Sequence, residues 1–356
     1  MKLISLTPDL AKEWDRIVYN SDDAWIFHLY GWLPLTEANW NLESKSFLAE
    51  YEGKIVGIFP LQLNRRSKSL KSTYMGLGGP ALMNGLHDGV RNKIIKAMHE
   101  HVYLIASQNQ SPYIEIFLNP LSKASLNNRW QINPLIHYLY EDVSTHTWII
   151  DLKLTEEEIV NNYSEVTRKK IRRANKEGYI IEPVTALSDV DHLYEVHCEN
   201  RKKTGAEIHP KNFFYGFYKE YCEKGLALML QAKDPQGDLV AFRATGLFKE
   251  CAMSWMGSCK TRHLDSGVNY LLHHHSLIWA KQHSLRWFES GEAFPNAQEG
   301  KMHGLTAFKE KFGGELHRLY KGRIMMNGPS RMKSAIEGLT KFSNFLRGAV
   351  RRARTI

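Results

Sequence analysis

Two glutamates lie at the expected end of a short apolar strand, in the sequence RWFESGE of residues 286–292. The pattern predicts a strand over 286–289 that ends at Ser290-Gly291. Ligands of α/β proteins bind at the carboxyl ends of strands, so Glu289 and Glu292 are candidates for accepting a proton from a bound ligand. The alternative is structural: Glu289 pairs with Arg262 or Arg286.

A helix is expected immediately before this strand. It opens at Ser266-Gly267 and is apolar on most sides to Gln282, which indicates burial against a sheet. Because a helix N-terminus between two strands can hold an anion, its first residues are candidates for binding a cofactor or donor. These candidates are Arg262, Gly267, Val268 and Asn269, and Trp255 on the preceding strand is a candidate substrate contact.

A second basic element lies in residues 151–178. Its helical part places Tyr163, Val166, Ile171 and Ala174 on one side, and Gly178 is the expected C-cap. The opposite faces carry two columns of cations at i,i+4 spacing: Arg168 and Arg172, then Lys169, Arg173 and Lys176. Arg168 and Arg172 could hold a phosphate or diphosphate of an acceptor; a solvated helix face is the alternative.

The spacing of the histidines and cysteines argues against a metal site. Consecutive helical residues point about 100° apart, so His273, His274 and His275 cannot face one metal ion and are interpreted as packing and surface residues. No metal is expected. The four cysteines form no CxxC pair, which favours reduced thiols in a cytoplasmic protein.

The composition is that of a globular protein, with 43% hydrophobic and 24% charged residues among 356. No apolar run reaches the roughly 18 residues that span a bilayer. Of the net charge of +9, residues 331–356 supply most, with seven basic residues and one acidic. The remainder is nearly balanced, which argues against nucleic-acid binding by the whole surface.

The C-terminal residues 326–356 predict a basic amphipathic helix, with apolar residues from Ala335 to Val350 at helical spacing. Such a helix could lie on an anionic membrane surface. It could equally be a last helix docked on the body of the protein.

The order of expected elements repeats. The first half of the chain is expected to contain a hairpin over 46–64, the strand-like TYMG, a helix opening at Gly89-Val90 and a strand over 112–118. Elements of the same kinds follow in the same order about 180 residues later. This duplication predicts an α/β protein with mixed sheets and two copies of one unit, at 1–150 and 151–325, followed by the helix of 326–356. The later copy is expected to hold the active cleft.

Four passages together resemble the FemABX-like branch of the GNAT acyltransferase superfamily, in which two GNAT domains lie in tandem. They are TRKKIRRANKEG (167–178), the helix over 267–281, WFESGE (287–292) and AFKEKFGG (307–314). The resemblance implies transfer of an acyl or aminoacyl group onto an amine of a sugar or peptide, in cell-wall peptide or surface-polysaccharide biosynthesis. The acceptor would be a small or lipid-linked molecule, handled in the cytoplasm or at the inner membrane face.

The resemblance also implies roles for individual residues. Lys309 aligns with a lysine that steadies phosphate or developing negative charge, and Phe308 beside it would contact substrate; a surface lysine flanked by core phenylalanines is the alternative. Acyl-CoA stays open as donor, although Asp265 occupies the place of a glycine in the pyrophosphate-binding motif of CoA-dependent relatives. Two alternative functions also stay open: a tRNA-dependent aminoacyltransferase, and a binding protein that has lost catalysis.

Overall fold

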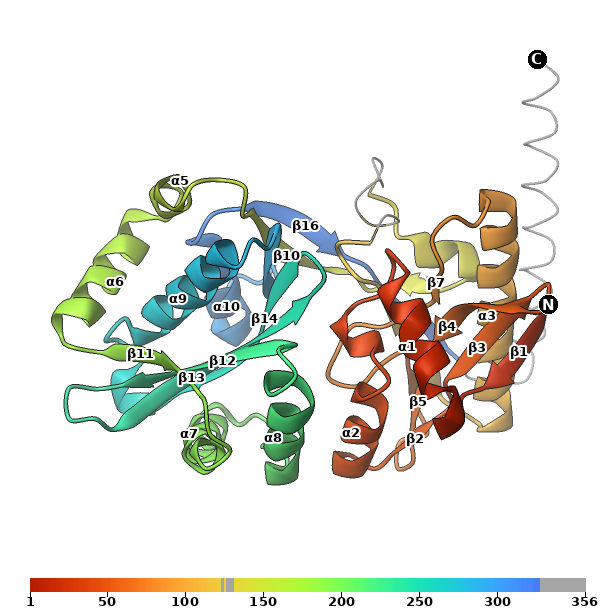
Figure 1. Ribbon diagram of the computed structural model, residues 1–356, viewed down its shortest axis with the longest axis horizontal. Helices are drawn as coiled ribbons and strands as arrows, with labels where there is room; N and C mark the ends of the chain where they lie inside the picture. The colour runs from red at the N-terminus through yellow and green to blue at the C-terminus, as the bar shows by residue number, and fades with distance from the viewer. Residues whose placement is uncertain (123–124, 126–130, 327–356) are drawn as a thin grey trace, which may run out of the picture. The chain divides into compact units, whose positions relative to one another are not determined.

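The computed structural model describes residues 1–122, 125 and 131–326, and the expected C-terminal helix lies outside them except for residue 326. The chain divides into two compact units (Figure 1). The first comprises residues 1–145 and returns at 318, and the second comprises 146–317. The sequence assigned residues 318–325 to the second domain; in the structure they belong to the first unit.

The first unit has two sheets, with strand orders β1-β3-β4-β7 and β2-β5-β6-β8-β17-β9. The strands are β1 (Lys2–Ser5), β2 (Leu42–Ser44), β3 (Phe47–Tyr51), β4 (Lys54–Phe59), β5 (Gln62–Asn64), β6 (Leu70–Lys71), β7 (Ala81–Leu82), β8 (Tyr113–Phe117), β9 (Glu141–Asp142) and β17 (Lys321–Met325). The α-helices are α1 (Ala11–Tyr19), α2 (Trp32–Asn39) and α3 (Asp88–Gln108).

The predicted hairpin of the first unit is confirmed. Strands β3 and β4 are joined by Glu52 and Gly53, which both have positive φ, as a tight two-residue turn requires. The long helix α3 packs its apolar face, with Ile94, Met98 and Val102, into the main core of this unit. The last described strand, β17, pairs with β8 and β9, so residues 321–325 return to the first unit and lie in the sheet that also contains β2, β5 and β6.

The second unit has one seven-stranded sheet, in the order β11-β12-β13-β14-β15-β10-β16. Its strands are β10 (Thr145–Asp151), β11 (Ile180–Pro183), β12 (Ala227–Lys233), β13 (Leu239–Phe248), β14 (Cys251–Cys259), β15 (Trp287–Ala293) and β16 (Glu315–Leu319). Its α-helices are α5 (Glu156–Asn161), α6 (Glu165–Lys176), α7 (Asp189–Thr204), α8 (Lys211–Phe217), α9 (Val268–Gln282) and α10 (Gly300–Glu310).

Helices cover both faces of this sheet. Figure 1 shows α6, α9 and α10 on one side of the strands and α7 and α8 on the other. The buried helix α9 was predicted from its apolar composition, and it places Leu271, Leu272 and Leu277 in the core against the sheet. It connects β14 to β15, which pair in parallel, as a crossover helix does.

Helix α6 ends before Gly178, as the sequence predicted, but it begins only at Glu165, because residues 162–164 separate it from α5. Ser164 caps its N-terminus by accepting from the backbone N–H of Thr167, and Gly178 follows its end with φ +81°. The predicted apolar face was wrong at one position: Val166 is 48% exposed, and Thr167 is buried instead. The polar Thr167 tolerates this burial because its hydroxyl donates to the carbonyl of Lys311.

The repeated order of elements is also seen, with two differences. Residues 73–76 of the first copy form bends rather than the expected strand, and Met75 there has φ +59°. The strand expected to end at 289–291 in the second copy continues to Ala293. Strand β15 stays extended as far as Ala293 because it pairs with β10 along most of its length.

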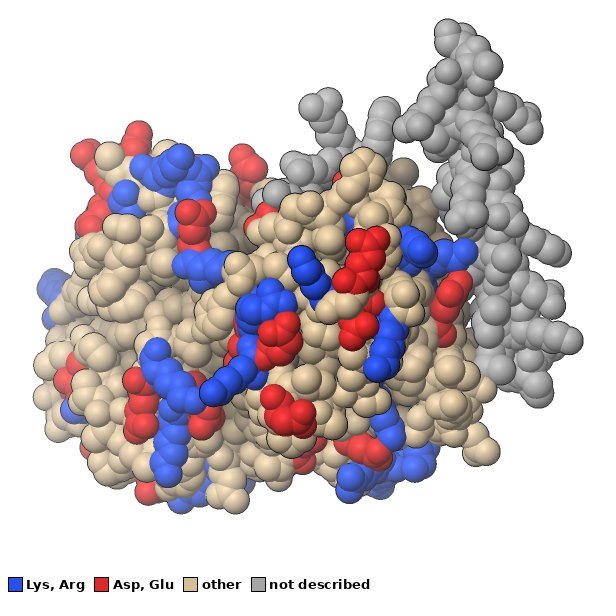
Figure 2. Space-filling view, turned by 45° about the vertical axis from the view of Figure 1, so that its right-hand side comes forward, with Lys and Arg blue, Asp and Glu red and all other residues tan. Residues whose placement is uncertain are grey.

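The surface carries mixed charge. On the face shown in Figure 2, Lys and Arg side chains lie beside Asp and Glu side chains rather than in one large patch. Among residues 1–122, 125 and 131–326, no helix combines the length and the apolar character that crossing a membrane demands.

Candidate active site in the second unit

Glu289 lies in the middle of β15, between β10 and β14. Its backbone is in register with Ile149 on one side and Met253 on the other, and its side chain is only 2% exposed. The expectation that Glu289 stands at the carboxyl end of its strand is therefore wrong. It is a carboxylate inside the sheet, where an ionised group needs compensation.

One oxygen of Glu289 is compensated and the other is not. The hydroxyl of Thr147 on β10 donates to Oε1, whereas Oε2 is buried without a hydrogen-bond partner in the described residues. Burial raises the pKa of Glu289 to about 7, and the Thr147 hydrogen bond and the nearby Lys309 oppose the shift. The predicted pairing with Arg262 or Arg286 is not formed, since these bind Asp238 at 3.3 Å and Asp151 at 3.1 Å.

Lys309, on α10, extends its side chain toward β15 near Glu289. Its Nζ donates to the backbone carbonyl of Glu292 at 2.5 Å and lies above Gly291, where an added Cβ would be 2.9 Å from Nζ. Burial lowers the pKa of Lys309 to about 8, with the positive charge of Arg243 acting in the same direction and Glu289 opposing it. Lys309 is thus a half-buried lysine held by a backbone carbonyl, and Phe312 near it is buried in the core.

Two further polar residues that the sequence did not single out join this pair. Arg243 on β13 donates through Nη1 to Ser254 Oγ at 2.5 Å, and its Nε has no partner in the described residues. His273 on α9 is fully buried, and neither of its ring nitrogens has a described hydrogen-bond partner. Burial, with Arg243 and Lys309 nearby, holds the pKa of His273 well below its usual range, so the ring is neutral. The signal for Arg243 was present, because an arginine interrupts the otherwise apolar VAFRATG of β13.

The three consecutive histidines diverge as helical geometry requires. His273 points into the core and packs on Phe312 at a centroid distance of 4.2 Å. His274 contacts the Tyr163 hydroxyl at 3.2 Å through Nδ1, and His275 is exposed. One helix therefore directs three identical side chains into three environments.

The loop before α9, expected to hold the donor, is occupied by contacts within the protein. Arg262 bonds to Asp238, and Asp234 lies 3.7 Å away, so its charge is already balanced. The backbone N–H of Thr261 donates to Glu199, and that of Val268 donates to Ser266 Oγ. A pyrophosphate bound at this loop would therefore lie near the carboxylates of Glu199, Asp234 and Asp238, which oppose its negative charge.

Gly267 has a packing role in this loop. Its φ is +94°, and a Cβ would lie 2.4 Å from the carbonyl oxygen of Lys170 on α6. The Lys170 ammonium in turn donates to the carbonyl of Asp265 at 2.8 Å. Val268 is buried in the core and Asn269 is half-buried. Helix α6 therefore packs against the N-terminus of α9.

The two arginines proposed to bind phosphate differ. Arg168 donates through Nη1 to the backbone carbonyls of Asn161 and Tyr163, which end α5 and precede α6. Arg172 is exposed and makes no hydrogen bond or ion pair with the described residues. Of the other cations of α6, Lys169 pairs with Glu165 and Arg173 with Glu177, each at 2.6 Å.

The remaining candidates fall on both faces of the sheet. Trp255 packs against Phe213 and Phe217, at centroid distances of 5.7 and 4.8 Å, on the side covered by α8. Phe308 lies on the other side, where its ring faces the Arg243 guanidinium at 5.8 Å. Glu292 contributes its backbone carbonyl to Lys309. The structure therefore brings Lys309, Glu289, Glu292 and Phe308 together, and leaves Trp255 and the loop of Arg262 elsewhere.

The chemistry of this cluster follows from its burial. A cation and a carboxyl that act on each other electrostatically, with pKa values near neutrality, can exchange protons with a bound group at physiological pH. The ammonium of Lys309 could also stabilise an oxyanion, since charge in a desolvated site acts more strongly than in water. This combination suits acyl transfer to an amine.

Comparisons with known proteins agree with this geometry. Residues 161–322 match the acetyltransferase (GNAT) domain family. The structure is similar to that of FemX, with a TM-score of 0.67 at 14% identity over 94% of this chain and 100% of that one. It is also similar to a tandem GNAT protein from the clavulanic acid biosynthesis pathway (TM-score 0.56, 13% identity, 92% and 99% covered) and to L-PGS from Bacillus licheniformis (TM-score 0.55, 13% identity, 94% and 98% covered). No curated protein matches by sequence.

The matched residues hold α6, α9, β15 and α10, and with them Lys309 and Glu289. The prediction of two tandem GNAT-like α/β domains is confirmed, as is the resemblance on which it rested. Residues 161–322 of this chain match the GNAT domain family, and the chain as a whole has the fold of FemX.

Proposed function

We propose that this protein is an N-acyltransferase that moves an acyl or aminoacyl group onto an amine of a sugar or peptide acceptor used in cell-envelope or surface-polysaccharide biosynthesis. The observation that carries the proposal is that the half-buried Lys309 acts electrostatically on the buried Glu289, and that burial moves the pKa of each toward neutrality. The envelope acceptor rests on the resemblance to the FemABX-like branch.

The reaction would use the pair as follows. The acceptor ammonium loses a proton to Glu289, whose Oε2 has no partner in the described residues. The freed amine attacks the carbonyl carbon of the donor ester or thioester, and the Lys309 ammonium stabilises the oxyanion. When the intermediate collapses, the C–O or C–S bond breaks, the C–N bond remains, and the leaving group takes up the second proton of the nitrogen.

The direct test is the Lys309→Met variant of the full-length protein, with Lys301→Met on the exposed face of the same helix as the control. Transfer is measured by mass spectrometry of amino-sugar and peptide acceptors. We expect Lys309→Met to lose about 100-fold or more in rate, the scale of removing one oxyanion stabiliser, and Lys301→Met to keep it. If both variants fold and transfer equally, the pair is structural, and a non-catalytic binding protein becomes the better reading.

A donor other than acyl-CoA is favoured by the loop of residues 260–267. Arg262 in this loop binds Asp238, the Thr261 amide donates to Glu199, and the amide of Val268, which follows the loop, donates to Ser266. An aminoacyl ester of tRNA does not depend on a pyrophosphate loop, so a tRNA-dependent aminoacyltransferase is the second candidate.

Parallel assays with acetyl-CoA and with a mixture of aminoacyl-tRNAs separate the two donors. Product formed only with aminoacyl-tRNA supports the second candidate. Saturable transfer from acetyl-CoA, or a CoA thioester retained by the purified protein, contradicts the assignment of the loop.

We also propose that residues 331–356 hold the protein at an anionic membrane surface. Their seven cations and helical apolar stripe support this proposal, at on the order of 1 kcal/mol of attraction per nearby cation. Co-sedimentation with anionic liposomes should be lost when these residues are deleted. Equal pelleting of both forms would refute it.

A further inference from the structure

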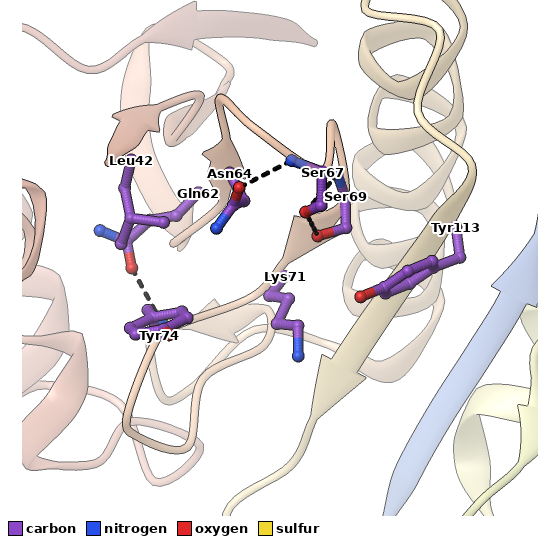
Figure 3. Close-up of a pocket in the computed structure, with 8 residues that line it drawn as sticks. All are labelled: Leu42, Gln62, Asn64, Ser67, Ser69, Lys71, Tyr74 and Tyr113. Atoms are coloured by element: carbon purple, nitrogen blue, oxygen red, sulfur yellow. Dashed lines mark hydrogen bonds between the residues drawn. The ribbon is translucent and has the colours of Figure 1, made fainter. Parts of the chain in front are cut away.

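A small polar pocket lies in the first unit, apart from the residues assigned to transfer. Its volume is about 200 Å³, and its lining comes from β2, β5, β6, the turn between β5 and β6, the loop after β6, and β8 (Figure 3). The lining includes one cation, Lys71, and neither Asp nor Glu. Such a pocket admits a small group and repels no anion.

The walls of the pocket are fixed by interactions outside it. Gln62 uses both ends of its amide: Oε1 accepts from the backbone N–H of Tyr74 at 2.9 Å, and Nε2 donates to Thr36 at 2.8 Å. Tyr74 also packs against Trp40 at a centroid distance of 5.3 Å. The pocket is therefore preformed, which lowers the entropic cost of filling it.

The groups with unused hydrogen-bonding capacity are donors. The Asn64 carbonyl oxygen accepts from the backbone N–H of Arg66 and Ser67, and its NH2 group has no acceptor among the described residues. The hydroxyls of Ser67 and Ser69 lie 2.8 Å apart, so one donates to the other and a second hydrogen stays available. Tyr113, whose hydroxyl points toward Lys71 in Figure 3, donates to no described residue.

The charge of the pocket is positive. Lys71 Nζ lies 2.7 Å from Glu115, but Glu115 also accepts from Arg323 at 2.9 Å. Two cations therefore share the Glu115 carboxylate, and Glu141 also acts on Arg323. The remaining hydrogens of the Lys71 ammonium are available to a ligand, since its side chain is 31% exposed.

A preformed pocket with unused donors, one lining cation and no lining carboxylate matches an acceptor-only, negatively charged group. We propose that the pocket binds an oxyanion, the phosphate or carboxylate group of a small ligand, through Lys71, Asn64, the serine pair and Tyr113. This site lies in the first unit, so the inference stands independently of the transfer reaction.

Titration of the full-length protein with sodium phosphate, sodium acetate and glucose, by calorimetry at constant ionic strength in chloride, tests the site. We expect saturable binding of phosphate or of acetate, whichever group the site prefers, and none of glucose. Lys71→Met should weaken this binding about tenfold or more, the value of a charge-assisted hydrogen bond. Tyr113→Phe, which leaves every charge in place, should weaken it about two- to tenfold.

The matched control is Lys68→Met, which removes an exposed cation of the same turn outside the lining. It should change the affinity less than about twofold, because exposed charges are screened. The proposal is overturned if neither anion binds saturably, if glucose binds as well as the anions, or if Lys68→Met weakens binding as much as Lys71→Met. Should Lys71→Met fail to fold, an unchanged affinity in Tyr113→Phe would still overturn it.

Discussion

Gly291 makes room for Lys309. The lysine crosses β15 to reach the carbonyl of Glu292, and a Cβ on residue 291 would lie 2.9 Å from its Nζ and 3.1 Å from the carbonyl oxygen of Ser254. Gly291 also has φ +90°, which L side chains rarely adopt. One glycine thus permits both the backbone conformation and the position of the charged group.

Gly291→Ala should therefore lower the free energy of unfolding by about 2–4 kcal/mol and displace Lys309. The control is Gly300→Ala at the start of α10, which has φ +75° but nothing within 4 Å of a Cβ. It should cost only the backbone strain, about 1–2 kcal/mol. Denaturant unfolding measures both, and equal losses would show that Lys309 is not in contact with residue 291.

Glu289 should make stability fall as pH rises toward neutrality. Its pKa is about 7 when folded against 4.5 for the free side chain, so between these values the folded protein holds a proton that the unfolded chain has released. Raising the pH through this window should cost about 3 kcal/mol of unfolding free energy. Glu289→Gln should remove this dependence, whereas Glu310→Gln, at an exposed position, should retain it.

The transfer rate should follow a bell-shaped pH profile. The rate rises as Glu289 loses its proton near pH 7, and falls above about pH 8 as Lys309 loses its charge. Glu289→Gln should lower the rate and abolish the acidic limb. A variant profile that keeps its acidic limb would assign that limb to another group.

Gly267→Ala should destabilise the protein by about 2–4 kcal/mol, because its Cβ would lie 2.4 Å from a backbone carbonyl of α6. Gly205→Ala, at the end of α7, has φ +63° and open space, and should cost about 1 kcal/mol. Thermal unfolding in the absence of any donor checks the difference. A Gly267→Ala protein as stable as Gly205→Ala would point to a ligand rather than packing as the reason for the glycine.

Substitutions of Arg168 and Arg172 should have different effects: the first should change stability, and the second should change substrate binding. Arg168→Met removes donors to two backbone carbonyls and should cost about 1–2 kcal/mol of stability. Arg172→Met should leave stability within about 0.5 kcal/mol, since the exposed side chain has no described partner. If Arg172 binds an acceptor phosphate, its loss should raise KM about tenfold with kcat unchanged, and an unchanged KM would exclude that role.

The sequence by itself determined the elements whose signals are local. The apolar α9, Gly178 after α6 and the hairpin at Glu52-Gly53 all follow from side-chain periodicity or backbone preference within a few residues. The order of these elements predicted the tandem fold, and a short motif placed Lys309 among the candidate residues.

Only the tertiary structure decided which of these residues meet. Strand β10 extends β15 beyond the predicted turn, and this places Glu289 inside the sheet rather than at its edge. Thr147, Arg243 and His273 come from three other elements, and no local pattern specifies that they converge on Lys309. Desolvation is a property of everything packed around a group, so the pKa values that favour transfer arise only when the sheet and its helices close over the site.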